Sequence, residues 1–185
     1  MKKESNGMFI FRLALTLFLI SAVTAGLLAG VNAVTAPIID ELNAQKQIDA
    51  MAAVVPDADT AVKMDYVDPS GQILAVYKTD TAYAVQVAAP GGFGGTLEMM
   101  VGVDLAGNVL GVSIINHSET AGLGAVAAEN TSKGNAFRGQ FNGSSGSVAV
   151  VKDGGTIDAI TGATITSRAV CNGVNAALEC VGNLG

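Results

Sequence analysis

The longest apolar stretch of the chain lies near its N-terminus. Between Arg12 and Asp40 there is no charged residue, and Leu13–Ile39 is dominated by Leu, Ile, Val, Ala and Phe. A helix needs about 20 apolar residues to cross a bilayer core of about 30 Å, so this stretch predicts one membrane-spanning helix. A cleaved signal peptide is the alternative, because small residues occur near the end of the stretch, although signal-peptide cores are shorter, about 7–15 residues.

Helical periodicity continues beyond the apolar stretch. In Ile38–Val55, apolar residues recur at helical spacings with polar residues between them. Pro37 suits the first turn of a helix, and Pro56 with Asp57 would end it. We therefore expect a helical stalk that continues the membrane helix and leads into a folded domain.

The following hundred residues alternate in part between apolar and polar positions, which is typical of strands. The predicted strands are Ile73–Thr79, Tyr83–Ala88, Leu97–Val103, Val109–Ile115 and Val148–Val151. The turn at residues 104–108 suits a hairpin, so the pattern predicts an antiparallel sheet. Two glycine-rich segments, Pro90–Gly95 and Gln140–Ser147, are predicted loops.

Two helices are predicted in the C-terminal half. Leu123–Phe137 has a weak helical pattern, whereas apolar residues recur every three or four positions from about Ser167 to Val181. We expect an α+β domain in which the antiparallel sheet packs against helices, on one N-terminal transmembrane helix. The predicted division is a cytoplasmic tip and membrane helix, a helical stalk and an extracytoplasmic domain, at residues 1–36, 37–56 and 57–185.

Charge predicts the orientation of this arrangement and excludes one class of partner. Basic residues precede the apolar stretch and acidic residues follow it, at Lys2, Lys3, Arg12, Asp40 and Glu41. The positive-inside rule then places the N-terminus in the cytoplasm and the remainder outside. The net charge is −6, and no basic cluster occurs beyond the N-terminal flank, so nucleic acid is not an expected partner.

The two cysteines predict neither a disulfide nor a metal centre. Cys171 and Cys180 lie nine positions apart in a predicted helix, about 13.5 Å along its axis at 1.5 Å per residue. A disulfide does not span that distance, so small buried thiols are expected. Without a CxxC or four-cysteine pattern, the sequence supports no iron–sulfur or zinc site.

The candidate chemistry lies in Asp158–Ser167. Gly162 and Ala163 permit close backbone approach just before the predicted helix, whose N-terminal N–H groups and dipole favour phosphate. The segment adds four hydroxyl groups, on Thr161, Thr164, Thr166 and Ser167. Taken alone, these residues have a more ordinary interpretation, since Ser and Thr are favoured helix caps with or without a ligand.

The segment also resembles the flavinylation motif of the FMN-binding domain family: an acid, two residues, Ser or Thr, Gly, Ala, Ser or Thr, any residue, Thr. The matching positions are Asp158, Thr161, Gly162, Ala163, Thr164 and Thr166. The resemblance implies that Thr166 carries FMN through a phosphoester, made by a separate FAD-dependent flavin transferase, with the neighbouring motif residues at the cofactor. Asp158 has two interpretations, a carboxylate recognised or used during transfer and a solvated acid.

A second signature lies upstream. The segment His117–Gly124 resembles the family sequence His-x-Glu-Thr-Pro-Gly-Leu-Gly, with Ala121 in place of Pro. The resemblance implies that the flavin ring and ribityl chain are lined by Glu119, Thr120, Gly122 and Leu123. The residues alone also fit a tight turn that opens a helix. For His117 a structural hydrogen bond is favoured over a catalytic role. Two basic side chains have two equally favoured interpretations, contact with phosphate and simple exposure to solvent. These are Lys152 and Arg168.

Within this family the chain resembles the G-type component of the Rnf complex, a membrane-bound ferredoxin:NAD oxidoreductase coupled to Na⁺ or H⁺ translocation. The resemblance implies covalent FMN, an electron relay rather than an independent catalyst, and a location in the cytoplasmic membrane. Implied partners are other subunits of the complex, the flavin transferase and membrane lipid. The alternatives are a C-type subunit of a Na⁺-pumping NADH:quinone reductase, a standalone membrane-anchored flavin reductase and an exported binding module without cofactor.

Overall fold

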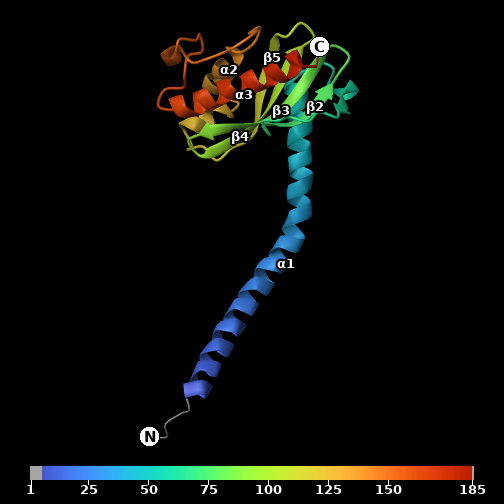
Figure 1. The fold of residues 1–185 in the computed structure, drawn as a ribbon. Coiled ribbons are helices and arrows are strands. Elements are labelled where there is room, and N and C mark those ends of the chain that lie inside the picture. The colour runs from blue at the N-terminus through green and yellow to red at the C-terminus, as the bar shows by residue number, and fades with distance from the viewer. Residues whose placement is uncertain (1–5, 185) are drawn as a thin grey trace. The chain divides into compact units, whose positions relative to one another are not determined.

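The computed structural model describes residues 6–184 (Figure 1). Lys2 and Lys3, used above to predict orientation, lie outside these residues. The chain forms two compact units, with the boundary between Gln45 and Lys46. The long first helix therefore ends inside the second unit, which is the folded domain. The helices and strands are α1 (Asn6–Val54), η1 (Ala58–Thr60), β1 (Val62–Met64), β2 (Ile73–Lys78), β3 (Ala82–Gly92), β4 (Gly95–Asp104), β5 (Val109–Asn116), η2 (Gly124–Ala127), α2 (Ser132–Gly139), η3 (Val151–Asp153) and α3 (Thr164–Gly182).

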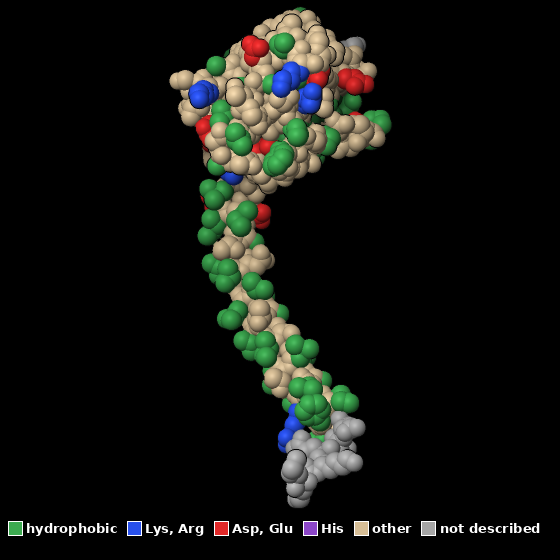
Figure 2. All heavy atoms as spheres, turned by 90° about the vertical axis from the view of Figure 1, so that its left-hand side faces the viewer, with side chains coloured by type: hydrophobic (Ala, Val, Ile, Leu, Met, Phe, Trp, Pro, Cys, Tyr) green, Lys and Arg blue, Asp and Glu red, His purple; other side chains and the backbone are tan. Residues whose placement is uncertain are grey.

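Helix α1 is one continuous helix of 49 residues, long and apolar enough to cross a membrane. Figure 2 shows hydrophobic side chains along its length. The predicted helical continuation beyond the apolar stretch is confirmed, but the predicted helix start at Pro37 is wrong, because Pro37 lies inside α1. A proline removes one backbone donor, and apolar helices tolerate that loss.

Five strands form one antiparallel sheet in the order β1-β2-β3-β4-β5. Each strand pairs with its neighbour in the chain, as the short connections predicted. The hairpin turn between β4 and β5 is confirmed by Asp104, whose carboxylate accepts the backbone N–H groups of Ala106 and Asn108 at 2.9 and 2.8 Å. Strand β1 was not predicted, because it has only three residues, two exposed and one half-buried, which carry little alternating pattern.

Both faces of the sheet are covered within the domain. Helix α3 packs across β3 and β4 on one face (Figure 1), where side chains such as Met99, Val101 and Val174 are fully buried. The last turns of α1 cover the other face, and a Cβ on Gly102 would lie 2.1 Å from the carbonyl oxygen of Val54. This close approach requires glycine at position 102.

The structure corrects two predicted loop and strand assignments. Pro90–Gly95 is not one loop, since β3 continues to Gly92, which pairs with Gly95 at the start of β4. Glycine backbones with positive φ at positions 91 and 95 let the strands continue into a tight hairpin. Val148–Val151 is not a strand but forms one isolated bridge, Val150 to Ile157, because the chain turns into η3 directly afterwards.

Two helix predictions change as well. The single helix expected at Leu123–Phe137 is two short ones, η2 and α2, separated where Thr131 caps α2 by accepting the Gly134 N–H at 3.2 Å. Helix α3 begins at Thr164, three residues before the expected start. Three of the four motif hydroxyl groups, on Thr164, Thr166 and Ser167, therefore lie at the start of α3, and Thr161 precedes it.

The two cysteines are free and buried on α3, as predicted. Burial raises the pKa of the Cys171 thiol to about 11, and it also raises the pKa of Cys180. Neutral thiols in such surroundings are small apolar side chains rather than reactive nucleophiles.

Candidate functional site

The site is built around one hydrogen bond between the two sequence signatures. The hydroxyl of Thr166 donates to Oε2 of Glu119 at 2.6 Å, and the two side chains are 1% and 9% exposed. A carboxylate acceptor at this short distance makes a charge-assisted hydrogen bond, which is stronger than one between neutral groups. The structure thus brings together the two residues that the separate motifs single out.

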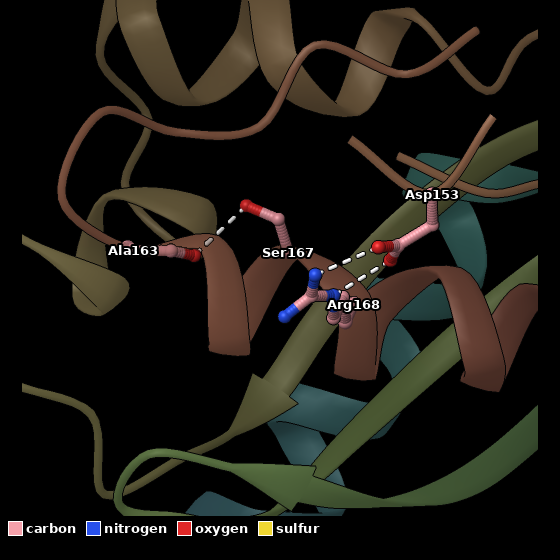
Figure 3. Close-up of polar contacts among 4 residues, drawn as sticks. All are labelled: Asp153, Ala163, Ser167 and Arg168. Atoms are coloured by element: carbon pink, nitrogen blue, oxygen red, sulfur yellow. Dashed lines mark hydrogen bonds and ion pairs between the residues drawn. The ribbon is translucent and has the colours of Figure 1, made fainter. Parts of the chain in front are cut away.

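Helix α3 places Thr166 in its first turn, where backbone N–H groups have no partner within the helix. The residue before the helix, Ala163, provides no side-chain cap. Ser167 instead fixes the preceding turn: its Oγ accepts the Ile160 N–H at 3.0 Å and donates to the Ala163 carbonyl at 3.0 Å (Figure 3). The open end of α3 therefore retains its capacity to bind an anion.

The Glu119 carboxylate is held from a second direction by the tip of the β3–β4 hairpin. Its Oε1 accepts the backbone N–H of Gly94 at 3.0 Å, and the Glu119 N–H donates to Nδ1 of His117 at 3.2 Å. His117 thus makes a hydrogen bond to the backbone of its own segment. With Oε1 engaged by the hairpin, Oε2 faces Thr166.

A cavity of about 350 Å³ opens beside this hydrogen bond. Seven of the residues predicted to bind cofactor line it: Thr166, Gly162, Ala163, Thr164, Glu119, Thr120 and Leu123. Phe93 and Ile165 line it as well, and together with Leu123 they give the cavity three exposed apolar side chains. The arrangement offers a hydroxyl nucleophile and helix N–H groups inside, with apolar surface toward solvent.

The other three predicted residues line a second cavity, of about 580 Å³. These residues are Asp158, Thr161 and Gly122. Asp158 is exposed, and its backbone N–H donates to the Gln140 side chain at 2.7 Å. The predicted residues are therefore divided between two cavities, with Thr166 at the first and Asp158 at the second.

The two basic candidates near the motif have different surroundings. Arg168 is engaged by Asp153 in a two-point contact of 2.6 and 2.7 Å (Figure 3), and hydrogen bonding to Arg168 lowers the pKa of Asp153. Lys152 lines the 350 Å³ cavity, whereas Arg168 is not among its lining residues. The structure therefore brings Lys152, rather than Arg168, to the predicted cofactor residues.

Sequence reasoning missed the glycines that make room for the carboxylate. A Cβ on Gly124 would lie 2.3 Å from Glu119 Oε2 and 2.6 Å from Thr166 Oγ1. A Cβ on Gly92 would lie 2.5 Å from Glu119 Oε1, and one on Gly94 would lie 2.0 Å from the Ser118 carbonyl. The glycine run at the hairpin was a visible signal, but its partner 25 positions later was not.

Comparison with known proteins matches two separate parts of the chain to two family models. Residues 92–179 match the FMN-binding domain, and residues 1–54 match the RnfG N-terminal region. Over 98% of its length the chain is 37% identical to the G component of the proton-translocating ferredoxin:NAD(+) oxidoreductase complex of Clostridium ljungdahlii, covering 96% of that protein. It is 34% identical to the Na(+)-translocating counterpart of Acetobacterium woodii, with coverage of 99% and 97%. Identity to the G component of the ion-translocating oxidoreductase complex of Erwinia tasmaniensis is 39%, with coverage of 86% and 83%.

Proposed function

The chain belongs to the RnfG family, the G components of ion-translocating ferredoxin:NAD oxidoreductase (Rnf) complexes, and from this we propose that it relays electrons through FMN joined covalently to Thr166. The observation that carries the covalent assignment is the Thr166–Glu119 hydrogen bond beside the 350 Å³ cavity. A buried threonine hydroxyl, activated by a carboxylate and facing a cavity, has the chemistry of a phosphate acceptor.

The residues present fit a flavin phosphate. The first turn of α3 presents unpaired N–H groups without a side-chain cap, and Lys152 adds a positive charge among the cavity-lining residues. Gly124 leaves beside Thr166 Oγ1 the space that a Cβ would fill. A phosphate bound at this helix end would therefore have donors and a cation around it.

Bound FMN would supply electron transfer in one- or two-electron steps. The residues around it would bind the phosphate, orient the ring and restrict the access of water. Phe93, Leu123 and Ile165 present apolar surface at the cavity and suit the faces of an aromatic ring. A covalent phosphoester keeps the cofactor in place without altering the ring itself.

The chain is a membrane protein by its long apolar helix α1 and by its family. We further propose that its N-terminus is cytoplasmic and its domain extracytoplasmic, as the basic residues before the apolar stretch indicate. Outside the cytoplasm a dissociated cofactor would diffuse away, and a covalent bond would prevent that loss. Other subunits of the complex would donate and accept the electrons.

Attachment would be made by a flavin transferase, and Asp158 is our candidate for its recognition. Asp158 is exposed and lines the 580 Å³ cavity, whereas Thr166 lines the 350 Å³ cavity. An exposed carboxylate at this other cavity is accessible to a second protein while the acceptor faces the flavin cavity. Asp158 thus suits recognition by the transferase better than contact with bound FMN.

The test is intact mass and peptide mapping of the chain after co-expression with a flavin transferase. We expect an FMN-phosphoryl adduct on the peptide that contains Thr166. An unmodified peptide, with a transferase that modifies a control substrate, would contradict the covalent assignment. Flavin that is bound but released on denaturation would restrict the proposal to noncovalent FMN.

A further inference from the structure

We propose that Glu119 accepts the proton of Thr166 when FMN is attached. The inference rests on the proposed function, because it concerns the reaction that loads the site. Thr166 Oγ1 already donates its hydrogen to Glu119 Oε2 at 2.6 Å, in a position buried from solvent. A carboxylate positioned on a hydroxyl nucleophile performs this role in phosphoryl transfer, because the attacking oxygen must lose its proton.

The orientation of Glu119 is set before any donor arrives. The Gly94 N–H engages Oε1 at 3.0 Å, so the carboxylate presents Oε2 to the hydroxyl. Glycine at position 124 leaves no side chain between the cavity and the pair. A base whose position is fixed in this way avoids the entropic cost of orienting it during the reaction.

The charges around the pair support the same assignment. Among the described residues that line the cavity, Glu119 and Lys152 are the charged ones. The His117 side chain contacts the backbone of Glu119 and not its carboxylate, with Nδ1 accepting the Glu119 N–H. Lys152 is suited to offset the negative charge of an incoming diphosphate, which leaves Glu119 as the carboxylate in contact with the reacting hydroxyl.

The proposed step balances with flavin adenine dinucleotide as donor. Thr166 Oγ1 attacks the phosphorus of the FMN half, and a bond forms between Oγ1 and that phosphorus. The bond from this phosphorus to the bridging diphosphate oxygen breaks, and adenosine monophosphate leaves with the oxygen. The proton of Thr166 passes to Glu119, and no atom is oxidised or reduced.

Transfer of the proton to Glu119 also avoids repulsion between two negative charges in the product. Esterified Thr166 has no hydrogen to donate, and the phosphodiester next to it is negatively charged. An ionised Glu119 would then face a like charge in a buried position, which is unfavourable. Glu119 that has taken the proton can instead donate a hydrogen bond toward the ester, so one residue serves both the reaction and the product.

The test is the initial rate of FMN attachment to the purified full-length chain in detergent, with transferase and FAD. Flavin fluorescence of the denatured protein reports the rate, and intact mass confirms the adduct. We expect Glu119→Gln, which can accept a hydrogen bond but not a proton, to lower the rate by about 100-fold or more. Glu119→Asp should recover part of the rate, since it restores a carboxylate.

The matched control is Glu98→Gln, because Glu98 accepts a 2.6 Å hydrogen bond from Gln86 in the sheet and is not among the residues that line the cavity. It should load at the wild-type rate. Thermal unfolding of each unloaded variant separates a slow reaction from a lost fold. If Glu119→Gln fails to fold, Glu119→Asp decides, since a folded Asp variant is expected to load more slowly than wild type.

The outcomes separate the two proposals. A wild-type chain that takes up no FMN contradicts the proposed function itself. A wild-type chain that loads, with a folded Glu119→Gln variant that loads equally fast or faster, overturns only the role of Glu119. The role of Glu119 is supported if the Glu119→Gln variant loads slowly and if, after long incubation, its product is as thermally stable as loaded wild type. In that product Gln would replace the protonated acid.

Discussion

The side chains of Thr166 and Glu119 are 47 positions apart in the sequence and joined by a hydrogen bond of 2.6 Å. One comes from the first turn of α3 and the other from the loop after β5. This contact makes a single site from two short signatures. It also determines which substitutions test the site, because both partners are buried.

Thr166→Val should abolish attachment of FMN, because it removes the acceptor oxygen while it preserves side-chain shape. The loss of the donor to buried Glu119 should cost about 1–3 kcal/mol in the free energy of unfolding. Thr166→Ser should still load, and Thr164→Val, at the same cavity, should retain the adduct. Intact mass after co-expression with the transferase checks all three. A covalent adduct on the corresponding peptide of the Thr166→Val variant would refute the acceptor assignment.

Gly124→Ala should impair both the site and stability. Its Cβ would lie 2.3 Å from Glu119 Oε2 and 2.6 Å from Thr166 Oγ1, so the pair must separate. We expect a destabilisation of about 1–3 kcal/mol from overpacking, with reduced attachment of FMN. The control is Gly139→Ala at the end of α2, where a Cβ meets nothing within 4 Å. Denaturant unfolding measures the stability, and flavin fluorescence measures the attachment of FMN. Gly139→Ala should be near wild type in both, and equal values for Gly124→Ala and Gly139→Ala would contradict the packing argument.

Lys152→Gln should reduce the rate of attachment, whereas Arg168→Gln should leave it near wild type. Lys152 lines the cavity, while Arg168 is paired with Asp153 at the surface. Exposed ion pairs contribute about 0–1 kcal/mol, so neither variant should unfold the domain. Raised salt should narrow the difference between wild type and the Lys variant. A larger defect in the Arg variant would reverse the assignment of the phosphate-contacting cation.

Asp68 should stabilise the domain at neutral pH and lose that effect in acid. Hydrogen bonds from Ser70 and from the backbone of Ile73 lower its pKa from 3.8 to about 2. A carboxyl whose pKa is lower in the folded state stabilises that state above its unfolded pKa, and the contribution disappears as pH falls from about 4 toward 2. NMR titration of the Asp68 carboxyl measures the shift directly.

The matched variants for this prediction are Asp68→Asn and Asp65→Asn. Asp68→Asn should lower the thermal stability at neutral pH. It should also reduce the loss of thermal stability between about pH 4 and pH 2, because the group that titrates is absent. Asp65 is exposed, and its replacement should leave the pH profile close to that of wild type. An Asp68 pKa near 3.8 would refute the prediction.

Local sequence patterns predicted most of the elements and failed at identifiable positions. The strands β2 to β5 and helix α3 follow from alternation and helical spacing, because these patterns record which face each residue buries. The hairpin at Gly92 and the bridge at Val150 were misassigned. At both positions pairing depends on a neighbouring segment, and the local composition carries no information about it.

The sequence by itself determined the apolar membrane helix, the antiparallel connectivity and the candidate residues, since each depends on residues close together in the chain. Only the tertiary structure decided that Glu119 contacts Thr166, that Asp158 faces another cavity and that Lys152 rather than Arg168 lines the site. These relationships arise when the sheet, the hairpin tip and α3 pack against one another. Packing brings distant residues within hydrogen-bonding range, and a motif specifies the residues but not the distances between them.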